Sequence, residues 1–327
     1  MHKPAYIKLL ESGELKKRTD EAERILRSCD CCPHDCKSDR TKNEYGICAS
    51  GYMPIVSSYT SHFGEEPVLS GSRGAGNIFF GNCNLKCVYC QNHEISQNWK
   101  SEIQNEVSVQ RLSDIMFELQ ECGCHNIGLV SPSHFSPQIL QAVYLSAKKG
   151  LHLPIIYNTN AYDSVEMLKL YDGVAEIYLP DIKYGNNDYG HSYSKIRNYF
   201  DHAKRALKEM FRQVGDELIY DNDVIIKGLI IRHLVLPNNL AESEEVFKFI
   251  SRELGTNVYI SLMSQYHPVH KAKKYELLNR RIRESEYERA LDLMHKYGLY
   301  NGWIQDMDSY EHYLPEFNKD RANPFGN

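Results

Sequence analysis

One stretch of the sequence decides the fold and the chemistry, namely NIFFGNCNLKCVYC at residues 77–90. Its first four residues form a short apolar run, which predicts a strand. Cys83, Cys87 and Cys90 follow with the spacing C-x3-C-x2-C. Three thiolates close together in a loop can hold three irons of a [4Fe–4S] cluster and leave the fourth iron open for chemistry. Three cysteines alone are also compatible with a zinc site or with buried structural thiols.

The composition is that of an ordinary folded protein. The chain has 327 residues, of which 25% are charged and 42% are hydrophobic, and its net charge is −5. These values exclude a disordered or fibrous chain, and the acidic balance gives no reason to expect nucleic-acid binding. The most apolar stretch, residues 224–237, contains Lys227, Arg232 and His233, so we expect no membrane span. We see no export signal and expect a cytoplasmic protein.

Strand-like and helix-like segments alternate after residue 77. The clearest helix lies within residues 196–214, where apolar side chains recur at helical spacing. The other expected helices are residues 109–121, 137–149, 164–171, 243–254 and 284–295. The other expected strands are residues 127–130, 154–157, 176–179, 224–236, 258–263 and 302–305. This alternation predicts an α/β fold with a parallel sheet, which we interpret as a partial (β/α)6 barrel with catalytic groups at the carboxyl ends of the strands.

We expect three regions along the chain. Residues 1–72 form a cysteine-rich N-terminal extension, with a short helix at 14–26 and loops toward its end. Residues 73–310 form the core barrel, and residues 311–327 form a tail without a periodic pattern.

The cysteine loop resembles that of the radical S-adenosylmethionine (SAM) superfamily. The resemblance rests on the C-x3-C-x2-C spacing, on the aromatic Tyr89 before the last cysteine, and on the strand that precedes the loop. It implies that SAM chelates the open iron of a [4Fe–4S] cluster. It also implies that the reduced cluster cleaves SAM to a 5′-deoxyadenosyl radical, which abstracts hydrogen from a substrate.

Within that superfamily the chain resembles the pyruvate formate-lyase activating enzymes and, more closely, a family of uncharacterised iron–sulfur proteins homologous to them. The matching segments are HFGEEP at 62–67, CVYCQN at 87–92, YNTN at 157–160, YLPDIK at 178–183, IRHLVLP at 231–237 and SQYHP at 264–268. The resemblance implies an electron donor such as flavodoxin or ferredoxin, and a glycyl residue of a partner enzyme as substrate. The alternatives are radical modification of a small molecule, peptide or RNA, and a non-catalytic iron–sulfur or zinc sensor or scaffold.

The resemblance also suggests residues that bind the cofactor. Asp181 and Lys183 are two apart at a strand end, so their side chains face the same way, and Lys183 matches a lysine that contacts the SAM carboxylate. Arg232 matches an arginine that contacts SAM. An exposed ion pair and an arginine bonded to backbone carbonyls are the structural alternatives.

Three more positions complete this set. His267 matches a histidine near the SAM ribose, Asn158 ends another strand, and Tyr89 is placed to lie along the adenine. Ordinary packing or helix capping is the alternative for each. His62, Glu65 and Glu66 precede the first strand, where they would either contact the substrate or stabilise a turn.

The chain departs from the activating enzymes after the second strand. Those enzymes carry a Gly-Gly-Glu-Pro segment that binds the SAM amino group, whereas this chain has SPSH at residues 131–134. Ser131, Ser133 and His134 are the candidate substitutes for the missing glutamate.

The remaining cysteines fall into two groups. Cys29, Cys32, Cys36 and Cys48 match the four-cysteine pattern of the homologous family, with Cys31 as an extra residue. They predict a second metal site, for which zinc and an iron–sulfur cluster both fit and reduced packing thiols are the alternative. Residues 122 and 124 are cysteines between a helix and a strand, where we expect packing rather than metal binding.

Overall fold

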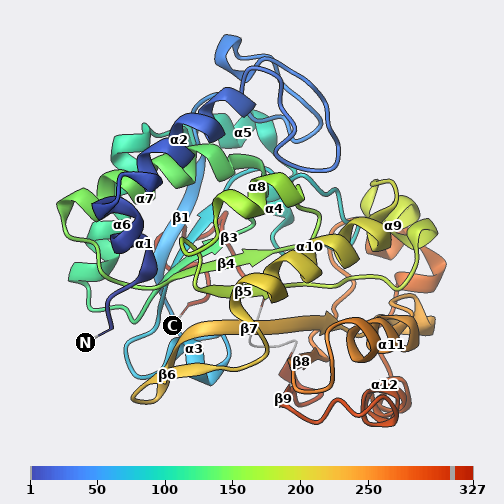
Figure 1. Ribbon diagram of the computed structural model, residues 1–327. Coiled ribbons are helices and arrows are strands. Elements are labelled where there is room, and N and C mark those ends of the chain that lie inside the picture. Colours follow the sequence, from blue (N-terminus) through green and yellow to red (C-terminus); the bar gives the residue numbers. More distant parts are fainter. Residues whose placement is uncertain (1, 310–313, 327) are drawn as a thin grey trace.

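A central sheet of mostly parallel strands organises the protein (Figure 1). The computed structural model describes residues 2–309 and 314–326. The strand order is β1-β2-β3-β4-β5-β7-β8-β9; β1 is antiparallel to β2, and every later neighbour along this path is parallel. The strands are β1 (Val56–His62), β2 (Ala75–Phe80), β3 (Ile127–Val130), β4 (Ile155–Thr159), β5 (Ile177–Pro180), β6 (Ile219–Asp221), β7 (Val224–Leu234), β8 (Tyr259–Met263) and β9 (Gly302–Ile304). The short β6 pairs with the start of β7 as an antiparallel hairpin.

Helices connect the parallel strands. The long ones are α2 (Glu14–Ile25), α6 (Val109–Glu121), α7 (Ser136–Lys149), α10 (Tyr199–Val214), α11 (Ser243–Glu253) and α12 (Glu284–Lys296). The shorter ones are α1 (Ala5–Glu11), α3 (Pro67–Ser70), α4 (His93–Ser96), α5 (Trp99–Glu102), α8 (Val165–Leu170) and α9 (Asn187–Ser194). In Figure 1, α2 lies beside α7 on one side of the sheet, in agreement with their contacts. No helix of the described residues combines the length and the apolar character needed to cross a bilayer.

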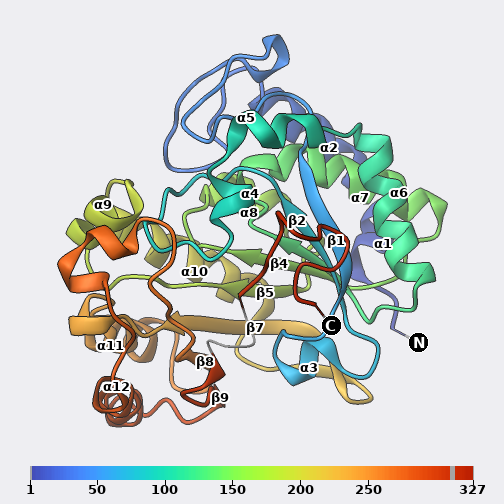
Figure 2. The ribbon, with the colours of Figure 1, turned by 180° about the vertical axis from the view of Figure 1, so that it is seen from behind.

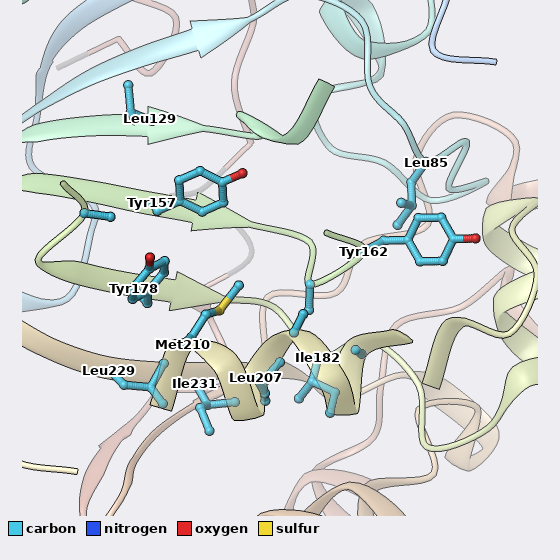
Figure 3. Packing of buried hydrophobic residues seen from close by; sticks show 14 of the residues in the cluster. Leu85, Leu129, Tyr157, Tyr162, Tyr178, Ile182, Leu207, Met210, Leu229 and Ile231 are labelled. Carbon is cyan, nitrogen blue, oxygen red and sulfur yellow. The ribbon is translucent and has the colours of Figure 1, made fainter. Parts of the chain in front are cut away.

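Both faces of the sheet are buried. Successive side chains of each strand point to opposite sides, so one strand contributes to two apolar clusters. Tyr157, Tyr178 and Ile231 point toward the helices, and Figure 3 shows Leu207 and Met210 of α10 packed near them. The other face forms a second apolar cluster of Leu69, Ile156, Ile177, Leu179, Leu218, Ile225 and Ile230. This second cluster is the base on which a polar cavity lies.

The predicted α/β order is confirmed, and each predicted helix and strand after residue 77 overlaps an observed one. The partial barrel stays a prediction. The largest difference is β1, which we expected to be loop and which belongs to the sheet although it precedes residue 72. The alternation of apolar and polar residues expected of a strand is interrupted by Ser57, Ser58 and Ser61. The strand is held in place by pairing with β2 and by contacts with the C-terminal segment.

Part of the predicted tail has a defined structure (Figure 2). Residues 314–326 are described, whereas residues 311–313 and 327 of the predicted tail lie outside the described residues. Phe317 is buried against Phe79, and Arg321 forms an ion pair of 2.7 Å with the buried Glu102. Figure 2 shows this segment, in dark red, crossing in front of β1 and β2. The tail therefore completes one wall of the core.

Buried His233 should make the protein less stable in acid. Its ring nitrogens lie 2.8 Å from the Ile182 carbonyl and 2.9 Å from the Ser243 hydroxyl, and burial lowers its pKa to about 4. The unfolded chain binds a proton on this imidazole near pH 6.5, so stability present above that pH is lost as the pH falls toward 4. Between pH 7 and pH 5 this residue should remove about 2 kcal/mol from the free energy of unfolding.

Urea unfolding at both pH values measures the effect. His233→Asn should remove this part of the pH dependence, and His295→Asn, on the exposed side of α12, should keep it. An unchanged pH dependence in the His233 variant would contradict the expectation.

Candidate active site

A cavity of about 440 Å³ opens at the carboxyl ends of the parallel strands. The strand pattern explains its lining, because Asn158, Asp181 and Arg232 stand two positions beyond Ile156, Leu179 and Ile230 of the second apolar cluster. Every residue predicted for the catalytic cluster and the cofactor lines this one cavity: Cys83, Cys87, Tyr89, Cys90, Asn158, Asp181, Lys183, Arg232 and His267.

The loop after β2 is fixed from outside the sheet. The backbone N–H groups of Lys86 and Val88 donate to the carbonyls of Ser194 and Tyr193 at 2.9 and 2.8 Å. Asn82, at positive φ, starts the loop, and its N–H donates to Ile95 of α4 at 2.8 Å. The cysteine loop therefore sits between two helices, α4 and α9, that hold its backbone in place.

The three cysteine thiols line one cavity, where each could bind a different iron of a cluster. Burial raises the pKa of all three, that of Cys87 to about 12, so metal binding has to displace their protons. Each sulfur also has a hydrogen-bonding neighbour: Ser194 Oγ lies 3.0 Å from Cys87 Sγ, Ser96 Oγ lies 3.3 Å from Cys90 Sγ, and the Leu85 N–H donates to Cys83 Sγ at 3.4 Å. Such hydrogen bonds to sulfur tune the reduction potential of a cluster.

Tyr89 belongs to the same hydrogen-bonded network. Its hydroxyl donates to Tyr184 at 2.7 Å, and the Tyr184 hydroxyl lies 2.8 Å from the Ser194 hydroxyl that contacts Cys87. No sequence pattern points to Ser194, which lies more than a hundred residues away from Cys87.

Asp181 and Lys183 form an ion pair of 2.7 Å at the end of β5. The pair is mostly buried, with 27% and 17% of the side chains exposed, so it is not the ordinary surface ion pair that was the alternative. Burial opposes the charged form of Lys183, but the carboxylate of Asp181 and the nearby Cys87 outweigh it and raise the pKa of the lysine. Lys183 is therefore a permanent cation beside the cysteine loop.

Arg232 is held by two carboxylates rather than by backbone carbonyls. Its Nε and Nη2 donate to Glu66 at 2.9 and 2.6 Å, and Nη2 also donates to Glu65. Glu65 in turn accepts from Asn77 at 2.7 Å. Gly128 makes room for that amide, because a Cβ at this position would lie 2.0 Å from Asn77 Oδ1. The predicted contact of Arg232 with SAM stays a prediction, and its Nε and Nη2 are already engaged.

The segment at residues 131–134 divides between the cavity and the core. Ser131, at a φ of 58°, lines the cavity. Ser133 is buried with its hydroxyl 3.2 Å from Thr159 Oγ1, and buried His134 contacts the Gly81 carbonyl at 2.9 Å. Of the three candidate substitutes for the missing glutamate, only Ser131 is among the lining residues.

The N-terminal cysteines gather in one irregular segment. Cys29 Sγ lies 3.7 Å from Cys31 Sγ, although Cys31 was expected to be the extra residue. Across residues 2–309 and 314–326, no three cysteine, histidine or acidic side chains converge closely enough to hold a single metal ion. The predicted site at Cys29, Cys32, Cys36 and Cys48 therefore stays a prediction.

The last two cysteines follow the end of α6. Cys124 is buried and lies 3.0 Å from the Ser61 hydroxyl, which confirms the packing role expected for it. Cys122 is exposed, so the same expectation is wrong for that residue, because the turn after the helix points it outward.

A three-cysteine loop that lines a cavity at the carboxyl ends of a parallel sheet is typical of enzymes that use an iron–sulfur cluster with one open iron. A family model of the radical SAM superfamily matches residues 77–250, and the chain belongs to this superfamily. It is also 36% identical over 294 residues to an uncharacterized protein of Methanocaldococcus jannaschii, a match that covers 87% of this chain and 79% of that protein. The protein is thus a radical enzyme that binds SAM and a [4Fe–4S] cluster.

Ser194→Ala should make the cluster harder to reduce. A hydrogen bond from the hydroxyl 3.0 Å from Cys87 Sγ would stabilise the additional negative charge of a reduced cluster, so its loss should move the reduction potential to a more negative value. A redox titration followed by electron paramagnetic resonance measures this potential. Ser192→Ala, at an exposed position of the same helix, is the matched control, and equal potentials in the two variants would contradict the expectation.

Proposed function

We propose that this enzyme abstracts a hydrogen atom from a substrate bound in the 440 Å³ cavity, and that a glycyl residue of a partner protein is its leading target. The observation that carries the proposal is that the three cysteine thiols and the Asp181–Lys183 pair line one cavity. A bound cluster with SAM supplies the one-electron reduction that cleaves SAM and yields the 5′-deoxyadenosyl radical.

The residues of the chain would bind and orient the cofactor. Lys183 would place its ammonium against the SAM carboxylate, and Asp181 would fix the lysine in position across 2.7 Å. The half-buried Asn158 and His267 offer polar atoms at the wall, and Tyr89 offers an aromatic ring. A one-electron donor such as flavodoxin or ferredoxin would reduce the cluster.

We also propose a metal at the N-terminal cysteines, for which Arg40 is the supporting observation. Its guanidinium is fully buried and donates to the carbonyls of Gly51 and His134. Within the described part of the chain no carboxylate lies within ion-pair distance of it. Burial works against its charge, yet Cys31, Cys48 and Cys29 raise the pKa of Arg40. Thiolates on a metal would supply the negative charge that this buried cation needs.

Anaerobic reconstitution with iron and sulfide, followed by SAM and dithionite, should yield 5′-deoxyadenosine. Replacing Cys83, Cys87 and Cys90 together by alanine should abolish both the cluster absorbance and the product, because the iron loses its protein ligands. Cys122→Ala, at the exposed position after α6, should leave both unchanged. Absence of product from a fully loaded wild-type enzyme would contradict the proposed function.

The glycyl target has its own test. Incubating the active enzyme with a glycyl-radical protein from the same cell should produce the doublet of a glycyl radical in an electron paramagnetic resonance spectrum. A glycine-to-alanine variant of the partner is the control. If 5′-deoxyadenosine forms and no radical appears on any such partner, the hydrogen donor is a different molecule.

The N-terminal metal is tested by elemental analysis of the purified protein. We expect zinc, or iron beyond that of one [4Fe–4S] cluster, and we expect Cys32→Ser to lose it together with thermal stability. Cys124→Ser, at a buried cysteine next to Ser61, should retain it. The same metal content in the Cys32 variant and the wild type would overturn the site.

A further inference from the structure

The loop between β1 and α3 brings three polar side chains into the same cavity as the cysteine loop. His62, Glu65 and Glu66 all line it, together with Arg232. They are deeply buried: the side chains of Glu65 and Glu66 are 9% and 6% exposed, and that of Arg232 is 13% exposed. We call Glu65, Glu66 and Arg232 the carboxylate floor.

The carboxylate floor carries one net negative charge. Burial opposes ionisation of Glu65, but the guanidinium of Arg232 outweighs it and lowers the pKa of this carboxyl. Burial likewise opposes the charge of Arg232, and the two glutamates raise its pKa. Two carboxylates therefore share one cation. A buried net charge is costly unless a further opposite charge meets it.

The whole cavity has the same imbalance. Among its described lining residues are four carboxylates, those of Glu65, Glu66, Asp181 and Asp306, and two cations, Lys183 and Arg232. The cavity is thus built to accept positive charge.

His62 is an independent sign that a ligand belongs here. Only 6% of this residue is exposed. The centroid of its ring lies 4.3 Å from that of Phe325 and 6.3 Å from that of Phe79. Among the described residues, neither ring nitrogen has a hydrogen-bond partner. Burial lowers the pKa of His62, so the imidazole is neutral and does not balance the glutamates. A polar group that lines a cavity without a protein partner is satisfied there by water or by a ligand.

We propose that the carboxylate floor and His62 bind a cationic nitrogen, an ammonium or a guanidinium, and that the substrate carries it on an apolar stem. Free lone pairs on Glu65 and Glu66 would accept from the N–H groups, and His62 would contribute a further hydrogen bond. Phe79 and Phe325 would pack against the stem. The inference rests on the proposed function for the identity of the substrate, and the α-ammonium of SAM is the second source of the same chemistry.

The test compares two probes of the same shape, n-butylguanidinium and n-butylurea. Calorimetry on the full-length reconstituted enzyme with SAM present should show the guanidinium bound at least about tenfold more tightly than the urea. In Glu66→Gln this preference should fall to near one, because the floor becomes neutral. Glu253→Gln, at the end of α11, is the control for removal of an acidic residue elsewhere and should keep the preference.

A second arm distinguishes the two sources of the nitrogen. Glu66→Gln should leave the affinity for SAM unchanged if the substrate supplies the cation, and should weaken it about tenfold or more if the SAM amino group does. Equal binding of both probes by the wild type, with unchanged SAM affinity in Glu66→Gln, overturns the proposal. The wild-type comparison does not depend on whether the variant folds.

Formation of 5′-deoxyadenosine in the same preparations separates this inference from the proposed function. If 5′-deoxyadenosine forms, but the enzyme does not prefer the guanidinium probe and Glu66→Gln binds SAM as the wild type does, only this inference is contradicted. If the enzyme prefers the guanidinium probe but forms no 5′-deoxyadenosine, the proposed function is contradicted and the binding site stands.

Discussion

The structure depends on holding three cysteine thiols, two of them buried and that of Cys90 partly buried, in one short loop at the end of β2. A loop of this kind has little apolar surface of its own, so neighbouring elements must fix it. Backbone carbonyls of Tyr193 and Ser194 accept its N–H groups from one side, and Ile95 of α4 does so from another. The segment between β5 and β7 that contains α9 therefore supports the cysteine loop and also connects two parallel strands.

Charge decides the arrangement of the cavity. Lys183 stays cationic because Asp181 lies beside it, and Arg232 stays cationic because two glutamates share it. In each pair the low dielectric of the interior strengthens the attraction but makes an unpaired charge costly. Residues 131–134 bring no carboxylate to the cavity, whereas Glu65 and Glu66 enter it from the loop after β1.

Local patterns in the sequence predicted much of this arrangement. The period of the apolar residues located α10, and the strand–loop order placed Asp181 and Lys183 at one edge with the three cysteines. The contacts of Arg232 with Glu65 and Glu66 span more than 160 positions and have no local signal. The contact of Ser194 with Cys87 has no local signal either. Nor does β1, because its serine-rich sequence does not predict a strand and only its pairing with β2 shows it to be one. The pattern and spacing of residues in the sequence therefore could not predict the long-range polar contacts of the site.

The C-terminal segment joins the site from the far end of the sequence. Phe317 and Phe325 pack on Phe79, and Arg321 bonds to Glu102 and to the Ser57 carbonyl on β1. These residues are synthesised after every strand of the sheet. The cavity wall that Phe79 and Phe325 form therefore stays incomplete while the earlier part of the domain folds. The part of the cavity lining that Phe325 contributes is therefore among the last parts of the site to be synthesised, long after the cysteine loop.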